Sequence, residues 1–245
     1  MARRAGPHHP IDLPLQERWR QVLEERLRLC LALAEAGVTI EDPLTTYIGT
    51  EVRIGSGTVI RPNTTLSGRT VVGRSCEIGP NAVVTDSTIG DGCRVIASVV
   101  EDSVLEEGVQ VGPFAHLRQG AHLGPGVRVG NYAEVKASRL GRNTQVNHFC
   151  YVGDAEVGAE VNIGAGTVTC NFDGRDKHRT VIEDGAFIGS GTMLVAPVRI
   201  GRGAATGAGS VVTRDVPAGA VVAGVPARPL EKGGARDESG HQQLG

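Results

Sequence analysis

Three side chains that can do chemistry fall within one short stretch of a chain otherwise rich in valine, isoleucine, glycine and threonine. Residues 135–154 read VKASRLGRNTQVNHFCYVGD and contain Lys136, His148 and Tyr151. A histidine can exchange a proton near neutral pH. His148 is therefore either a chemical group or one more polar residue on the outside of a repetitive scaffold, and the elements that hold it must decide between the two.

Those elements are defined by a six-residue repeat. Aliphatic residues recur six apart, first at Ile48, Ile54, Ile60, Leu66, Val72, Ile78 and Val84, again from Val111, and with one-residue slips as far as Val212. A period of six fits neither a helix nor simple strand alternation. It predicts short strands joined by tight turns, with three hexads per coil and coils stacked about 4.8 Å apart. We therefore predict an all-β parallel β-helix of roughly nine coils over residues 46–215.

The repeat also fixes which polar side chains face outward. Arg118 and Lys136 each follow an inward aliphatic residue and lie 18 residues apart, so they should stack on one face of successive coils. Two stacked cations repel unless an anion such as a phosphate lies between them. A phosphate site and a solvated basic ladder both remain open for this pair.

A second set of residues shares one edge of the predicted prism. His148 lies in a turn, and the same turn position of later coils holds Ala165, Ser190 and Ala208. Small residues there would line a groove along one edge, where backbone amides are reachable. Tyr151 and Asn162 each precede an inward aliphatic residue and should also face out. On the pattern alone, a structural role is favoured over a functional one for each of these residues.

Other segments depart from the repeat. Residues 15–37 have apolar residues at helical spacing, with Gly37 as a stop, and their polar side carries both signs of charge. The apolar face should pack on this subunit or a neighbouring one rather than on a membrane. Residues 170–180, CNFDGRDKHRT, should loop out of the coil. The expected plan is a disordered 1–14, a helix and lead-in at 15–45, the β-helix at 46–230 and a disordered tail at 231–245.

Composition excludes several classes of function. Lysine and arginine number 25 against 27 aspartates and glutamates, which gives no global basic surface for nucleic acid or anionic membrane. The five cysteines show no CxxC or Cys/His spacing, so we expect free thiols, a reducing cytoplasm and no metal site. No apolar run is long enough for a signal peptide or a membrane span.

Several motifs occur in an order that resembles a known family. They read VGPFAHLRQGAHLG, VGNYAEVKASRLG, VNHFCYVGDAEVG, NIGAGTVTCNFDG, DKHRTVI and FIGSGTMLVAPV. Together they resemble the C-terminal acetyltransferase domain of the bacterial bifunctional N-acetylglucosamine-1-phosphate uridylyltransferase/glucosamine-1-phosphate N-acetyltransferase family. This resemblance implies a left-handed β-helix of hexapeptide repeats and a homotrimer with sites at subunit boundaries. It also implies acetyl-CoA as co-substrate, with no tightly bound cofactor.

The resemblance assigns roles on the acceptor side. Arg118 and Lys136 would hold the sugar phosphate, and Tyr151 and Asn162 would contact the amino sugar. His148 would be the general base that takes the proton of the 2-amino group as it attacks the acetyl thioester.

On the acetyl-CoA side, backbone amides near Ala165 would stabilise the oxyanion of the tetrahedral intermediate. The residues that the resemblance assigns to acetyl-CoA are Ala165, Asn171, Phe172, Lys177, Ser190, Ala208 and Arg228. Lys177 would reach substrate or cofactor from the extruded loop and, in a trimer, serve a neighbour's site.

Three departures from the family pattern bear on these roles. No glycine-rich nucleotide loop precedes residue 46, so uridylyltransferase activity is not expected. The family's late CoA-contacting arginine falls on Val225, and Arg228 is the candidate replacement. Phe172 stands where the family often has tyrosine, which removes one hydroxyl contact to CoA.

The leading hypothesis is acetyl transfer to glucosamine 1-phosphate. The product would feed UDP-N-acetylglucosamine synthesis for the cell envelope, completed by a separate uridylyltransferase. One alternative is a hexapeptide acyltransferase that acts on a different amino sugar, such as a nucleotide-linked one. The other is a non-catalytic trimeric partner of a nucleotidyltransferase. The complete set of sugar-site residues argues against both.

Overall fold

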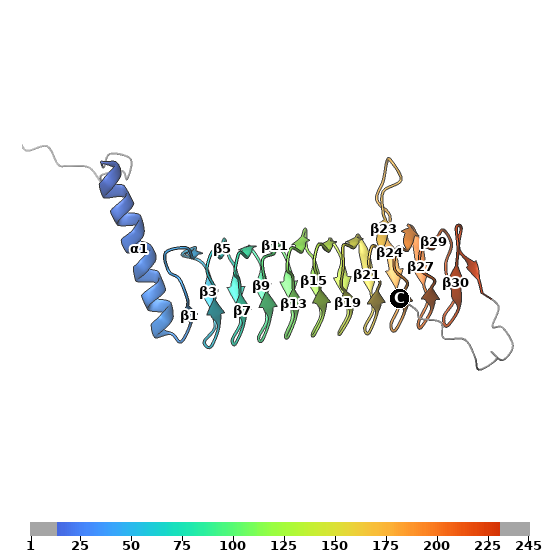
Figure 1. Cartoon of the computed structure of the whole chain (residues 1–245), viewed down its shortest axis with the longest axis horizontal. Helices are drawn as coiled ribbons and strands as arrows, with labels where there is room; N and C mark the ends of the chain where they lie inside the picture. The colour runs from blue at the N-terminus through green and yellow to red at the C-terminus, as the bar shows by residue number, and fades with distance from the viewer. Residues whose placement is uncertain (1–13, 231–245) are drawn as a thin grey trace, which may run out of the picture.

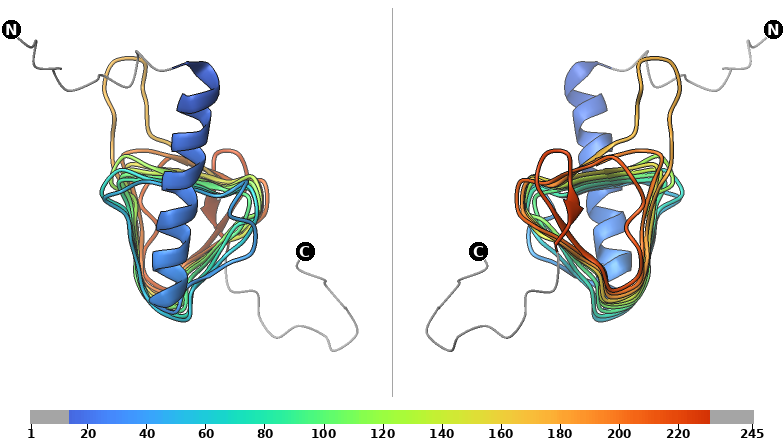
Figure 2. Two further views of the ribbon diagram at one scale, coloured as in Figure 1. Left: turned by 90° about the vertical axis from the view of Figure 1, so that its left-hand side faces the viewer. Right: turned by 90° about the vertical axis from the view of Figure 1, so that its right-hand side faces the viewer.

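The computed structural model describes residues 14–230, which form one α-helix followed by a long prism of short strands (Figure 1). Each coil of the chain contributes one strand to each of three sheets, and the sheets form the three sides of a triangle in cross-section (Figure 2). The β-helix that the six-residue repeat predicts is confirmed. The predicted disorder of residues 1–14 and 231–245 lies outside the described residues, except at Pro14.

The three sheets are called A, B and C in the order in which each coil visits them, and all their strand pairings are parallel except that of β30 with β31. Sheet A has twelve strands: β1 (Thr39–Ile40), β4 (Val59–Ile60), β7 (Glu77–Ile78), β10 (Arg94–Val95), β13 (Gln110–Val111), β16 (Arg128–Val129), β19 (Gln145–Val146), β22 (Asn162–Ile163), β25 (Phe187–Ile188), β28 (Ala205–Thr206), β30 (Val221–Ala223) and β31 (Arg228–Pro229). Sheet B has ten: β2 (Tyr47–Ile48), β5 (Thr65–Ser67), β8 (Val83–Thr85), β11 (Val99–Glu101), β14 (His116–Arg118), β17 (Glu134–Lys136), β20 (Tyr151–Gly153), β23 (Val168–Cys170), β26 (Met193–Val195) and β29 (Val211–Val212). Sheet C has nine: β3 (Arg53–Ile54), β6 (Val71–Val72), β9 (Thr88–Ile89), β12 (Val104–Leu105), β15 (His122–Leu123), β18 (Arg139–Leu140), β21 (Ala155–Val157), β24 (Thr180–Ile182) and β27 (Val198–Ile200).

The core is a set of stacked aliphatic columns inside the prism. The inward residues that the repeat identifies are buried in the coils from Ile60 onward, and the small residues two places before them are buried with them. The inward aliphatic column also continues between Val84 and Val111, where the six-residue spacing of the sequence is lost. Ile89, Val95, Val100 and Leu105 fill the column there, because those coils are shortened in their turns while the strands stay in register.

The helix α1 (Leu15–Glu35) packs across the first coils with a different face from the one we expected. Cys30 is buried, Leu33 packs against the core, and Arg26 stacks over the ring of Tyr47 at 4.0 Å. The apolar residues that defined the predicted face remain exposed in this chain: Leu15, Trp19, Val22, Leu23, Leu27 and Leu31. Within residues 14–230 the chain therefore does not cover that face, and its packing on a neighbouring subunit stays a prediction.

The insertion leaves the prism at the corner between sheets B and C, as the broken repeat predicts. It projects as a hairpin after β23 (Figures 1 and 2), with a bridge between Phe172 and Lys177 and a hydrogen bond from the His178 amide to the Asn171 carbonyl at 2.7 Å. In the hairpin, the carboxylate of Asp173 accepts a hydrogen bond from the imidazole of His178 at 2.7 Å. The base of this hairpin lies beside the outward face of sheet B.

Candidate active site

The predicted basic pair lies on sheet B, and each cation has a carboxylate of its own. Arg118 and Lys136 are register partners in β14 and β17. The Arg118 guanidinium lies 2.7 Å from Glu134, and the Lys136 ammonium lies 2.9 and 3.1 Å from the two oxygens of Asp154. The stacked cations are thus partly compensated within the chain, without an external anion.

Lys136 is buried even though its side chain points outward from its strand. Only 5% of its side chain is exposed, so the solvated basic ladder is excluded for this residue. Burial by itself lowers the pKa of Lys136, but the hydrogen bonds and the charge of Asp154 outweigh that effect and raise the pKa overall. The ammonium is therefore held in its charged form.

A third cation from the hairpin joins this surface. The pKa of Lys177 is lowered, first by the neighbouring Lys136 ammonium. The charge of Arg118 acts on Lys177 in the same direction. The three cations are Arg118, Lys136 and Lys177, and the two carboxylates beside them are Glu134 and Asp154. The excess positive charge favours binding of an anionic ligand.

Tyr151 and Asn171 complete the sheet B cluster. The side-chain amide of Asn171, which is buried at the base of the hairpin, donates to the Tyr151 hydroxyl at 3.4 Å and also to Asp154. The Tyr151 hydroxyl lies over Gly153, the register partner of Lys136, since a Cβ built on Gly153 would be 2.4 Å from that oxygen. The tyrosine is thus held against the Lys136–Asp154 pair.

Replacing Gly153 with alanine should displace Tyr151 from this cluster. The added methyl group would overlap the hydroxyl, and the loss of the Tyr151 contacts should lower the free energy of unfolding by about 1 kcal/mol. Denaturant unfolding monitored by circular dichroism would measure the loss. Gly49→Ala is the matched control, because its Cβ would find only ordinary contacts at 3.6 Å. Equal stability of both variants would contradict the proposed packing.

His148 lies at the corner between sheets A and B, with its imidazole exposed. Its ring nitrogen Nδ1 is 2.7 Å from the side-chain oxygen of Asn131, which occupies the same corner one coil earlier. The backbone carbonyl of His148 accepts from the amide of Gly166 at 3.0 Å, which links it to the next coil. The other ring nitrogen, Nε2, has no hydrogen-bond partner within residues 14–230.

The small residues predicted to share this corner do form a column below His148. The register pairs of β19, β22, β25 and β28 place Ala165, Ser190 and Ala208 at the equivalent position of successive coils. In the described part of the chain, the amide N–H groups of these three residues find no acceptor. The column therefore presents unpaired donors along one edge of the prism.

The remaining predicted residues are not gathered with these. Asn162 is half-buried on sheet A, between Gln145 and Phe187 in register, and so faces a different side of the prism from Lys136. Phe172 is exposed on the hairpin. Arg228 lies on β31 at the C-terminal end of sheet A, where its guanidinium bonds only to the adjacent Ala227 carbonyl within residues 14–230.

The chain is similar to known proteins along most of its length. Residues 77–162 match the family described as GlmU-like, C-terminal hexapeptide, and residues 179–214 match the bacterial transferase hexapeptide (six repeats). A bifunctional protein GlmU from Carboxydothermus hydrogenoformans is 55% identical over 186 residues, which covers 76% of this chain and 42% of that protein. One from Thermotoga petrophila is 55% identical over 197 residues, with 80% and 44% covered.

This chain belongs to the GlmU-like C-terminal hexapeptide family. Its fold is the left-handed parallel β-helix expected for that family. A Francisella novicida UDP-N-acetylglucosamine acyltransferase has the same fold, with a TM-score of 0.55 at 16% identity over 78% of this chain and 70% of that one. The chain spans less than half the length of the GlmU proteins named above.

Three residues that contact the predicted site residues were not among the sequence predictions. Asp154 pairs with Lys136, Glu134 with Arg118, and Asn131 with His148. Each lies about one coil from its partner or in the neighbouring strand, so the repeat that identified the outward cations could also have identified the groups stacked against them. The signal for Asp154 was strongest, because it follows Lys136 by a full coil within the quoted GD motif.

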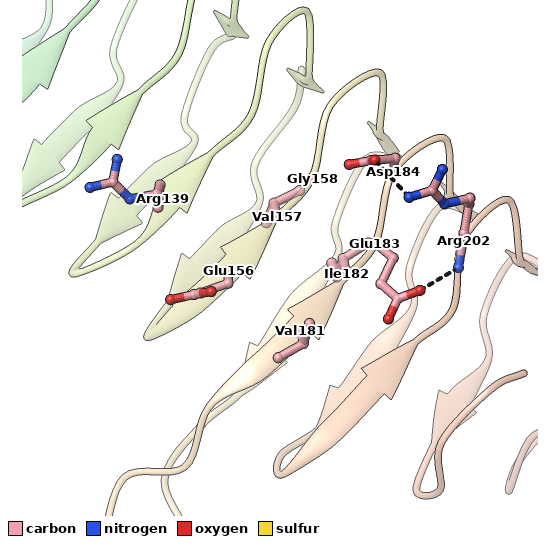
Figure 3. Close-up of a pocket in the computed structure, with 9 residues that line it drawn as sticks. All are labelled: Arg139, Glu156, Val157, Gly158, Val181, Ile182, Glu183, Asp184 and Arg202. Atoms are coloured by element: carbon pink, nitrogen blue, oxygen red, sulfur yellow. Dashed lines mark hydrogen bonds and ion pairs between the residues drawn. The ribbon is translucent and has the colours of Figure 1, made fainter. Parts of the chain in front are cut away.

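A groove on the opposite side of the prism differs from the sheet B cluster in its charges. It has a volume of 310 Å³ on sheet C and the corner towards sheet A, and Arg139, Glu156, Glu183, Asp184 and Arg202 supply its charges (Figure 3). Arg202 lies 3.4 Å from Asp184, and its amide donates to Glu183 at 2.9 Å. Charges of both signs are interspersed there, so the groove has no excess charge to attract an anion.

Within residues 14–230, no three His, Cys, Asp or Glu side chains are grouped so as to hold a metal ion. In that same part of the chain, α1 lacks the run of apolar residues that crossing a bilayer would need.

Proposed function

We propose that this chain transfers the acetyl group of acetyl-CoA to the 2-amino group of glucosamine 1-phosphate. The observation that carries the proposal is the sheet B cluster, in which a buried Lys136 and two further cations offer excess positive charge to a sugar phosphate. Its GlmU relatives are described as bifunctional proteins, and this chain matches their C-terminal hexapeptide region. The product would be N-acetylglucosamine 1-phosphate, a precursor for UDP-N-acetylglucosamine.

The reaction needs a base, a place for the phosphate and donors for the oxyanion. The neutral amine attacks the thioester carbonyl, and Nε2 of His148 accepts the proton that the nitrogen loses. The tetrahedral oxyanion is stabilised by backbone N–H groups of the corner column, starting at Ala165. Collapse of this intermediate breaks the carbon–sulfur bond and expels CoA, whose thiolate receives the proton held by His148.

The column below His148 is the proposed groove for acetyl-CoA. The unpaired amides of Ala165, Ser190 and Ala208 can bond to the amide groups of an extended pantetheine arm. Phe172 and Lys177 on the hairpin can close over it from the side. Arg228 is proposed to meet the phosphates of CoA near the C-terminal coils, where Val225 is exposed and carries no charge. Asn171 is proposed to act through Tyr151 and Asp154, which already use its side-chain amide.

A complete site needs a second copy of the chain, which is why we propose a homotrimer. Asn162 and Lys136 face different sides of one prism, so a single small sugar reaches both only if another subunit supplies one of them. The hairpin projects beyond its own prism and is placed to reach a neighbour (Figure 2). We further propose a cytoplasmic location, where acetyl-CoA is available and the five free cysteines stay reduced.

The test is an acceptor comparison that follows release of the CoA thiol. With acetyl-CoA as donor, glucosamine 1-phosphate should be acetylated, and a UDP-linked amino sugar should react much more slowly. Turnover only with the UDP-linked sugar would assign the chain to a different acceptor. An absence of turnover with both would support a non-catalytic partner of a nucleotidyltransferase instead.

A further inference from the structure

The contact between His148 and Asn131 bears on how the proposed base is prepared. Nδ1 of His148 lies 2.7 Å from Oδ1 of Asn131. An amide oxygen can only accept a hydrogen bond, so this geometry requires a proton on Nδ1. In a neutral imidazole that proton leaves Nε2 as the acceptor. Both tautomers are populated in a free neutral histidine, whereas this contact selects one of them.

The backbone holds the two side chains in this relation. The amide of Phe149 donates to the carbonyl of Asn131 at 2.9 Å, and the carbonyl of His148 is bonded to Gly166 on its other side. The coils are also closely stacked here, because a Cβ on Gly130 would lie only 1.9 Å from the carbonyl oxygen of Asn147. The corner that carries Asn131 is therefore fixed relative to the corner that carries His148.

We propose that Asn131 is a positioning residue that holds His148 in the tautomer with Nε2 free to accept a proton. The inference rests on the proposed function, since it assigns the base atom of that reaction. Asn131 acts through His148 and does not itself touch the reacting atoms. We expect its loss to cost about 10- to 100-fold in activity, by analogy with groups that orient metal-binding histidines.

The direct test is the nitrogen-15 NMR spectrum of His148 in the intact chain at a pH where the ring is neutral. Nδ1 should carry the proton, and Nε2 should show the shift of an unprotonated ring nitrogen. In Asn131→Leu, which has a similar shape but no acceptor, the spectrum should show both tautomers. Asn131→Asp keeps an acceptor and should keep the Nδ1–H form.

Kinetics supply the second readout. Asn131→Leu should lower kcat about 10- to 100-fold with little change in the KM for the acceptor. Asn131→Asp should retain more activity than Asn131→Leu, because its side chain still offers an oxygen acceptor to Nδ1 of His148. Asn147→Ala is the matched control, since that amide lies in the same corner but only approaches Gln145, at 3.5 Å.

An unprotonated Nδ1 in the wild-type chain, or an unchanged kcat in Asn131→Leu, would overturn the inference. Failure of the proposed function would give a different result from failure of this inference. Wild-type protein would then transfer no acetyl group, while the NMR spectrum would still show whether the Asn131 contact selects the tautomer.

Discussion

His148→Ala should reduce kcat for acetyl transfer to glucosamine 1-phosphate by a factor of about 10² to 10⁴, the usual contribution of a general base. The side chain is exposed at a corner and takes no part in the core, so the variant should fold as the wild type does. The KM for either substrate should change little, because the proposed site holds the phosphate on sheet B and CoA along the corner column. Steady-state assays of thiol release would measure both parameters.

A second histidine makes the control specific. His122 lies on sheet C, where its ring is 2.6 Å from Glu106 and far from the A/B corner. His122→Ala removes a half-buried imidazole outside the proposed site and should leave kcat within a few-fold of the wild type. Acetyl transfer that survives in His148→Ala would contradict the assignment of the base, and an equal loss in both variants would point to a general effect on the fold.

Lys136→Met should weaken both the fold and the binding of the sugar phosphate. The substitution keeps the length of the side chain but leaves Asp154 without its cation, with Asn171 as its remaining hydrogen-bond donor. Breaking one half of a buried ion pair typically costs about 3–5 kcal/mol in the free energy of unfolding. The acceptor KM should rise as well, since the most buried of the three cations is gone. Chemical denaturation and acceptor titration would measure the two effects separately.

The double variant separates stability from binding. Asp154→Asn alone leaves a buried, uncompensated ammonium and should also be destabilising. Combining Lys136→Met with Asp154→Asn removes both charges and should recover much of the stability, because neither charge is left unpaired. It should not restore acceptor binding. A double variant that recovers a normal acceptor KM would show that Lys136 serves only the fold.

The contribution of the Lys136–Asp154 pair to stability should change with pH in one direction. The pKa of Lys136 is raised above its ordinary value of 10.5, so its contribution to stability is fully present below that pH. It is lost as the pH rises through the folded-state pKa. The wild type should therefore lose stability relative to the double variant at strongly alkaline pH, a difference that thermal unfolding across that range would detect.

The sequence determined the scaffold because a six-residue repeat has only one simple structural solution. Each inward aliphatic residue of the series specifies a strand and a turn, so strands, faces and the column containing His148, Ala165, Ser190 and Ala208 all follow from counting. The projecting hairpin followed from the break in that count. Even the shortened coils around Val95 changed only the length of turns, since strand pairing keeps neighbouring coils in register.

The tertiary structure decided everything that depends on how side chains meet across coils. Spacing placed Lys136 on the outside, but only the hairpin, Asp154 and Tyr151 together bury it, and no local pattern encodes that cover. Spacing likewise could not show that Asn131 meets the imidazole of His148, or that α1 turns Cys30 rather than Trp19 towards the prism. A repeat fixes backbone positions because its hydrogen bonds are periodic. Burial, ion pairing and tautomer depend on single contacts between residues that are a full coil apart.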